Sequence, residues 1–144
     1  MREKEWHTYE MIVNGLPQRV RYRTVTVEHL FLPLLRRLRE LQHCSGRRCI
    51  VFLAAPPATG KSTLAQFLAQ LSRTEEGLTL VQALGMDGFH YPNRYLAAHT
   101  ILRDGEEIPL TSIKGAPETF DVPALAAKLG AARAGRVTFP VYDR

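Results

Sequence analysis

The sequence predicts an α/β fold in which helices cover both faces of a parallel sheet, making three layers. Three apolar runs, residues 49–54, 78–86 and 137–142, alternate with helical patterns. Continuous apolar runs of this length are typical of central parallel strands that are covered on both faces. The order strand, helix, strand, helix, strand indicates parallel layering with right-handed crossovers. We therefore expect an incomplete sheet of about three core strands.

A β-hairpin and an amphipathic helix are expected before this sheet. Asn14-Gly15 lies between two β-prone runs, which is the strongest short hairpin signal because both turn residues need positive φ. Apolar residues then recur every three or four positions over residues 27–43, where Pro33 should kink the helix or delay its start. These features define an N-terminal extension, residues 1–48, ahead of a core domain, residues 49–144.

Residue types indicate where the helices of the core domain begin or end. Gly77 follows a pattern that places four apolar residues on one face: Leu64, Phe67, Leu68 and Leu71. A short helix is expected near Asn93, and residues 104–118 are expected to form a loop because they are rich in charge, Gly and Pro. Asp121 can cap a last helix that runs to about Ala134.

Charge and hydropathy exclude several classes of protein. The chain has 144 residues and a formal charge of +5, and residues 1–48 hold 10 basic and 5 acidic side chains. We expect a solvated basic face and no nucleic-acid binding, since no nucleic-acid motif accompanies this charge. The apolar runs are too short to cross a membrane, and the first residues have no apolar signal core. These features predict a cytoplasmic protein.

A phosphate-binding pattern lies between the first apolar run and its helix. The segment reads Ala55-Pro56-Pro57-Ala58-Thr59-Gly60-Lys61-Ser62-Thr63, and its end matches G-x-x-x-x-G-K-[ST]. Gly60 lets backbone N–H groups turn toward phosphate oxygens, Lys61 can reach the β- and γ-phosphates, and the Ser62 hydroxyl can ligate Mg²⁺. Ala55 stands in place of the first glycine; if this position needs a positive φ, alanine costs about 1 kcal/mol.

Three further strings follow the phosphate loop in order. They are Gly85-Met-Asp87-Gly-Phe-His90-Tyr-Pro-Asn93, Lys114-Gly-Ala-Pro-Glu-Thr-Phe-Asp121 and Phe139-Pro-Val-Tyr142-Asp143. Together with the loop they resemble the P-loop kinases of the phosphoribulokinase, uridine kinase and bacterial pantothenate kinase superfamily. The first two strings look most like pantothenate kinase. The double proline and Met-Asp-Gly-Phe-His look more like the bacterial nucleoside/nucleotide kinase-like branch, which includes a kinase linked to fructose transport.

The resemblance covers about residues 49–144 and implies a P-loop NTPase fold. It also implies transfer of the γ-phosphate of ATP to a hydroxyl of a small metabolite, such as a nucleoside, a pantothenate-like acceptor or a sugar. Asp87 then takes the proton from the acceptor hydroxyl and lies near the metal, so that Lys61 and Asp87 are catalytic and Ser62 and Asp87 hold Mg²⁺. The acceptor side is implied to include four residues: His90, Tyr91, Lys114 and Tyr142.

Members of these kinases continue through an arginine-bearing lid and further strands, so we expect this chain to match the front half of such an enzyme. An open sheet edge would favour pairing of two copies. Two other functions stay open on the residues alone. One is a P-loop NTPase that couples hydrolysis to a partner, and the other is an inactive, truncated kinase that binds nucleotide without transfer. The identity of the acceptor stays open as well.

Overall fold

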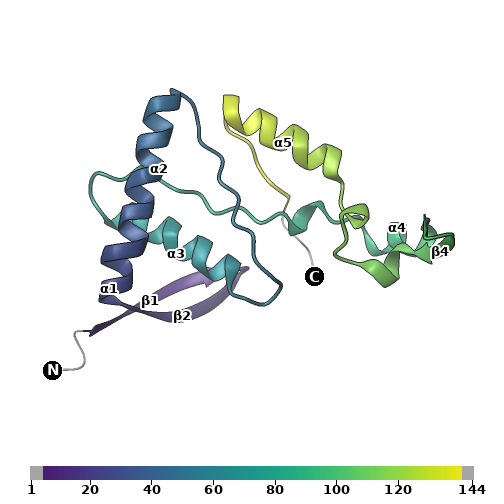
Figure 1. Ribbon diagram of the computed structural model, residues 1–144, viewed down its shortest axis with the longest axis horizontal. Coiled ribbons are helices and arrows are strands. Elements are labelled where there is room, and N and C mark those ends of the chain that lie inside the picture. The colour runs from purple at the N-terminus through teal and green to yellow at the C-terminus, as the bar shows by residue number, and fades with distance from the viewer. Residues whose placement is uncertain (1–4, 141–144) are drawn as a thin grey trace. The chain divides into compact units, whose positions relative to one another are not determined.

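The computed structural model describes residues 5–140, which fold as two compact units, residues 5–84 and 85–140. The fold is mixed α/β, with two small antiparallel sheets of two strands each among the described residues. The first unit contains strands β1 (Trp6–Val13) and β2 (Leu16–Arg23) and helices α2 (Leu32–Ser45) and α3 (Lys61–Thr74) (Figure 1). No helix in the described part of the chain is long and apolar enough to cross a membrane.

The expected N-terminal hairpin is confirmed. β1 pairs with β2 from Trp6 opposite Arg23 to Val13 opposite Leu16. Asn14 and Gly15 make the turn with φ of 51° and 80°, as a tight hairpin turn requires. One face of the hairpin carries the partly buried Tyr9 and Tyr22, which point toward the core of the first unit.

The expected helix at residues 27–43 is also confirmed, with an irregular first part. Helix α1 (Thr24–Thr26) leads through a π-helical segment, η2 (Val27–Phe31), into α2. The Leu32 N–H donates to the Val27 carbonyl, which lies five residues back. Pro33 follows directly, in the first turn of α2. A proline has no N–H to donate and crowds the carbonyl four residues before it, so a widened turn at this point lets the helix continue.

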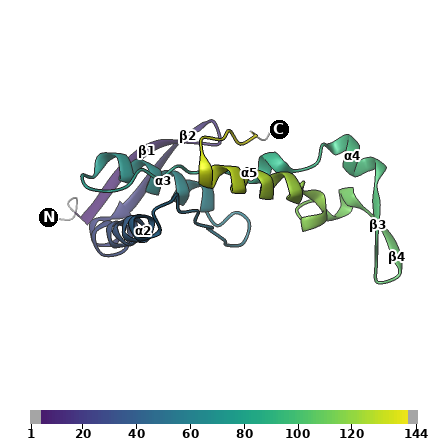
Figure 2. The same cartoon turned by 90° about the horizontal axis from the view of Figure 1, so that it is seen from above.

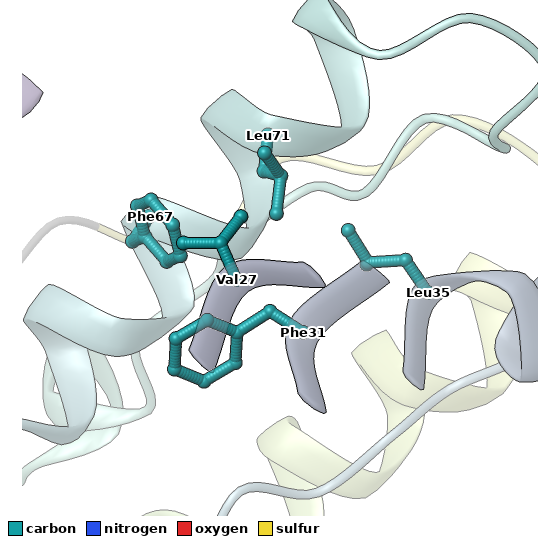
Figure 3. Packing of buried hydrophobic residues seen from close by; sticks show 5 residues of the cluster. All are labelled: Val27, Phe31, Leu35, Phe67 and Leu71. Atoms are coloured by element: carbon teal, nitrogen blue, oxygen red, sulfur yellow. The ribbon is translucent and has the colours of Figure 1, made fainter. Parts of the chain in front are cut away.

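The core of the first unit packs α3 against the N-terminal hairpin and helix. Phe67 of α3 is completely buried, and its ring lies 4.7 Å from the Tyr9 ring, 4.2 Å from the Tyr22 ring and 5.3 Å from the Phe31 ring, measured between centroids. Figure 3 shows the buried residues of this cluster: Val27, Phe31, Leu35, Phe67 and Leu71. The N-terminal segment thus buries the apolar face of the helix that follows the phosphate loop.

The expected parallel sheet is not present among the described residues. Residues 49–54 and 78–86 form no strand, and Val51, Phe52 and Leu80 keep exposed fractions of 58%, 76% and 73%. Residues 137–140 form no strand either, and positions 141 and 142 lie outside the described residues. A parallel strand exists only beside a hydrogen-bonded neighbour and under layers on both faces. Apolar composition alone therefore does not make these segments strands.

The second unit is built from short elements. They are η3 (Asp87–Phe89), α4 (Asn93–Ala98), β3 (Thr100–Arg103), β4 (Glu106–Pro109), η4 (Leu110–Ile113), η5 (Pro117–Thr119) and α5 (Val122–Ala134). Figure 2 shows β3 and β4 as a narrow hairpin after α4. The expectation of a loop at residues 104–118 is wrong for β4. Asp104 and Gly105 make a turn with positive φ, and Ile101 pairs with Ile108.

Candidate functional site

The phosphate loop lies in the first unit, between residues 49–54 and α3. Gly60 has a φ of 86° and precedes the first residue of α3, and its carbonyl accepts from the Leu64 N–H at 2.9 Å. Because glycine adopts this left-handed conformation without steric cost, the chain can turn sharply into the helix here. Residues 55–60 are exposed.

The Lys61 ammonium is folded onto the loop. Its Nζ donates to the carbonyl oxygens of Ala55 and Pro56, both at 2.7 Å. The Thr59 hydroxyl also donates to the Pro56 carbonyl at 2.7 Å. These contacts keep the positive charge beside the loop, where a phosphate oxygen could replace the two carbonyls as its partner.

The start of α3 fits a polyphosphate. No side chain caps this helix and no acidic residue lies in its first turn. Its first N–H groups have no acceptor within the helix and carry the positive end of the helix dipole. Ser62 is exposed in this turn, so its hydroxyl is available as a ligand for a bound cation. Lys61, Ser62 and these amides would hold a nucleoside triphosphate and Mg²⁺.

Backbone strain in the loop is at Ala58 and not at Ala55. Ala55 is not among the described residues with positive φ, whereas Ala58 has a φ of 61°. The expected cost of alanine in a left-handed conformation, about 1 kcal/mol, therefore applies three residues later than the sequence indicated. The pattern of glycines in the motif could not locate this strain, because Ala58 stands at a position that the motif leaves unspecified.

In the second unit, the Asp87–Tyr91 segment pairs with the Thr119–Asp121 segment. The Tyr91 N–H donates to the Thr119 carbonyl at 3.0 Å, and the Asp121 N–H donates to the Phe89 carbonyl at 2.7 Å. The His90 ring stacks on the Phe120 ring at 3.7 Å between centroids. Two strings that lie about thirty residues apart in the sequence are therefore one structural feature. Asp87 opens this feature at the start of η3 and is exposed.

Lys114 lies at the start of the loop that leads to the Thr119–Asp121 segment. Its Nζ donates to Asn93 Oδ1 at 2.9 Å, which links the loop to the start of α4. Next to it, the fully buried Thr119 hydroxyl accepts from the Gly115 N–H at 3.0 Å and donates to the Ala116 carbonyl at 2.7 Å. Thr119 thereby fixes the course of the chain between Lys114 and Asp121.

The third string also reaches this feature. A Cβ atom built on Gly88 would lie 1.9 Å from the Pro140 carbonyl oxygen, so no larger residue fits there without displacement of the backbone. The Phe89 and Phe139 rings meet edge to face at 5.5 Å between centroids. Tyr142, which was expected on the acceptor side, lies outside the described residues.

Asp121 and Tyr91 share an electrostatic environment. The Asp121 side chain accepts from the Ala124 N–H at 3.0 Å and caps α5, which confirms the expected cap. Burial raises the pKa of the Tyr91 hydroxyl, and the negative charge of Asp121 raises this pKa further. The Tyr91 hydroxyl therefore stays protonated and can donate a hydrogen bond.

The sequence did not indicate that Lys128 lines a hollow or that Gly88 lies against the Pro140 backbone. Lys128 lies two turns into α5, and with Asp121, His90 and Tyr91 it lines an open hollow of about 460 Å³. A lysine within a run of alanines and leucines carries no motif that would single it out. Among residues 5–140, no group of three or more His, Cys, Asp or Glu side chains is placed to hold a metal ion.

Known proteins resemble this chain over different lengths. "Uncharacterized protein YggC" of Escherichia coli (strain K12) is 43% identical over 136 residues, which are 94% of this chain and 54% of that protein. "Pantothenate kinase" of Cutibacterium acnes is 37% identical over 96 residues, 65% of this chain and 27% of the kinase. "Pantothenate kinase" of Bradyrhizobium diazoefficiens is 32% identical over 135 residues, 81% of this chain and 40% of the kinase.

The chain thus spans about half the length of the E. coli relative and a smaller share of the pantothenate kinases. No family model matches the chain, and no solved structure matches it. The similarities to proteins named pantothenate kinase, together with the phosphate loop, support a P-loop kinase-like family for this chain.

Proposed function

We propose that this protein is an ATP- and Mg²⁺-dependent kinase that transfers the γ-phosphate to a hydroxyl of a small metabolite. One observation carries the donor side of the proposal. A left-handed Gly60 precedes a helix with no side-chain cap, and the Lys61 ammonium lies on the carbonyls of the same loop. Similarity to proteins named pantothenate kinase supports the reaction type.

On the donor side, Lys61 exchanges its two carbonyl partners for oxygens of the β- and γ-phosphates. The first amides of α3 hold the same phosphates through hydrogen bonds and the helix dipole. The Ser62 hydroxyl would be a ligand of Mg²⁺, and this ion would supply positive charge to neutralise the charge that develops on the transferred phosphoryl group. The loop positions the phosphates and does no covalent chemistry of its own.

On the acceptor side, Asp87 orients the attacking hydroxyl and takes its proton. The carboxylate stands at the exposed start of η3, whose backbone is tied to the Thr119–Asp121 segment. His90, Tyr91 and Lys114 supply a ring, a hydroxyl and an ammonium for recognition of the acceptor. The acceptor is a nucleoside, a pantothenate-like molecule or a sugar, and consumption of ATP fits a cytoplasmic location.

The test is acceptor-dependent phosphoryl transfer from radiolabelled ATP. The acceptors would be pantothenate, uridine and fructose, and the enzyme forms would be wild type and the Asp87→Asn variant. Asparagine keeps the shape but cannot take a proton, so transfer should fall by about a hundredfold or more while ATP binding persists. Asp104→Asn makes the same chemical change in the β3–β4 turn and should leave transfer unchanged.

Three results would contradict the proposed function or the role of Asp87 in it. Transfer by Asp87→Asn at the wild-type rate would show that the carboxylate has no part in the reaction. Phosphate release that no acceptor stimulates would instead indicate an NTPase. Binding of ATP with neither transfer nor release would indicate an inactive nucleotide-binding protein.

A further inference from the structure

The two cysteines of the chain flank the turn that ends α2. Cys44 lies in the last turn of α2 and is exposed, and Cys49 lies five residues later and is partly buried. Both are free thiols in the structure. The proposed phosphate site uses neither of them, so their position at one turn is a separate feature of the first unit.

The turn between the two cysteines is held by hydrogen bonds. Gly46 has a φ of 62°, and its N–H donates to the His43 carbonyl at 3.3 Å. The Ser45 hydroxyl lies 3.0 Å from the Gln42 carbonyl oxygen and 2.9 Å from the Arg47 carbonyl oxygen. A left-handed cap of this kind turns the chain sharply out of the helix.

A contact across the turn brings Cys49 back to the helix. Its N–H donates to Gln42 Oε1 at 3.4 Å. Gln42 precedes Cys44 by two residues, which is about 3 Å along the helix axis. Arg47 and Arg48 belong to no helix or strand, so they can adjust without breaking an element. A disulfide needs its two Cα atoms to come within about 7 Å, and this short, adjustable connection allows that approach.

The charges around the two thiols favour an anionic oxidant. Residues 41–49 contain two arginines and no acidic residue. Arg47 and Arg48 are both exposed and lie between the cysteines in the chain. Positive charge attracts an anionic reagent and raises its rate of encounter. Glutathione disulfide carries a net negative charge, so it meets the exposed Cys44 thiol under favourable electrostatics.

We propose that Cys44 and Cys49 form a reversible disulfide that lowers the affinity of the phosphate loop for ATP. The Cys44 thiolate attacks one sulfur of glutathione disulfide and displaces a glutathione thiolate. The Cys49 thiolate then attacks the Cys44 sulfur of this mixed disulfide and displaces the second glutathione thiolate. The protein gives up two electrons and two protons, and glutathione disulfide becomes two molecules of glutathione. In a reducing compartment such a bond is transient and senses the redox state.

The bond acts on the phosphate loop through the segment that follows Cys49. Residues 49–54 form no strand and lead directly into the loop, and Figure 1 shows an irregular stretch of chain between α2 and α3. The first two carbonyls of the loop, those of Ala55 and Pro56, accept from the Lys61 ammonium. Nucleotide binding requires these contacts to rearrange, and a covalent tie at Cys49 restricts the rearrangement. This effect on ATP rests on the proposed kinase function.

Formation of the disulfide is tested on the full chain in a glutathione redox buffer. The intact mass and the free thiols are measured after acid quenching at increasing fractions of glutathione disulfide. We expect a monomer that loses two hydrogen atoms and both free thiols, and dithiothreitol should restore them. Cys49→Ser should instead accumulate the mixed disulfide of Cys44 with glutathione. A wild-type chain that keeps both thiols, or that forms disulfides only between two chains, would overturn the proposal.

The effect on the phosphate loop is measured by calorimetry of Mg·ATP binding to the reduced and the oxidised protein. We expect the oxidised wild type to bind about fivefold more weakly or worse. Cys44→Ser cannot form the internal bond, so it should bind Mg·ATP equally well under both conditions. Equal affinity of the reduced and the oxidised wild type would overturn the regulatory role of the bond.

Failure of this proposal can be told apart from failure of the kinase function. The mass and the thiol count report on the disulfide without any nucleotide. If the reduced protein binds Mg·ATP and phosphorylates an acceptor but no bond forms, the redox proposal is wrong and the kinase function stands. If the bond forms but the reduced protein binds no Mg·ATP, the kinase function and the effect on ATP are both wrong, and only the disulfide stands.

Discussion

The phosphate loop of the first unit leads into a helix that is anchored by a completely buried phenylalanine, whereas the Asp87–Tyr91 segment of the second unit is held by backbone hydrogen bonds to another loop. Phe67 lies among three aromatic rings. In the second unit, the Tyr91 N–H donates to the Thr119 carbonyl and the Asp121 N–H donates to the Phe89 carbonyl. The donor side thus depends on side-chain packing, whereas the acceptor side combines ring contacts with a close fit of two backbone segments, so different substitutions should damage them.

The largest effect is expected from Phe67→Ala. Deletion of a fully buried ring among three other rings removes buried apolar area and leaves a cavity, which costs about 3–5 kcal/mol. Hydrogen exchange should show loss of protection in α3, while amides around Thr119 keep their protection. ATP binding, measured separately, should become weaker. Phe52→Ala removes the same ring at a position that is 76% exposed and should cost less than about 0.5 kcal/mol.

Equal loss of protection in the two units would contradict this prediction. If Phe67→Ala reduced protection around Thr119 as much as protection in α3, the two units would depend on the same core. The distinction between packed and hydrogen-bonded support would then be wrong.

A smaller effect is expected from Gly88→Ala in the second unit. Its Cβ would lie 1.9 Å from the Pro140 carbonyl oxygen, so the two backbone segments must separate. Overpacking of this kind costs about 1–3 kcal/mol and should reduce acceptor binding while ATP binding is kept. Gly130→Ala is the matched control: no atom lies within 4 Å of its added Cβ, and alanine within α5 should stabilise the protein by about 0.5–1 kcal/mol. Equal stability of the two variants, measured by urea unfolding, would contradict the close approach at Gly88.

The smallest effect is expected from Ala58→Gly in the phosphate loop. Relief of the left-handed alanine should gain up to about 1 kcal/mol, because glycine adopts a φ of 61° without a steric penalty. The gain should be seen in the midpoint of urea unfolding, and ATP affinity should be kept or improved. Ala55→Gly has no such strain to relieve, so it should not stabilise. Stabilisation by Ala55→Gly but not by Ala58→Gly would place the strain back at the first position of the motif.

The sequence could predict the features that depend on local chemistry. Asn14-Gly15 specified the hairpin turn, the apolar spacing around Phe67 specified the buried face of α3, and Asp121 specified the cap of α5. In each case the residue and its nearest neighbours determine the conformation. The same holds for the phosphate loop, whose Gly60 opens the helix as the motif predicts.

Features that depend on distant neighbours could not be predicted. Val51 and Phe52 read as a buried strand, but a strand also needs partners, and the described residues provide none beside them. The pairing of His90 with Phe120 and the contact of Gly88 with Pro140 join segments far apart in the chain. Lys128 lines the hollow together with residues of these distant segments, and no local sequence pattern predicts this position.

The phosphate site is tested most directly by calorimetry of Mg·ATP binding to wild type, Lys61→Ala and Arg73→Ala. Arg73 lies in the last turn of the same helix and controls for a loss of charge. We expect binding by wild type and Arg73→Ala and at least a tenfold loss in Lys61→Ala, since a charge-assisted bond to phosphate disappears. A folded wild-type protein that binds no Mg·ATP, or a Lys61→Ala variant that binds it equally well, would contradict the phosphate site on which the proposed function rests.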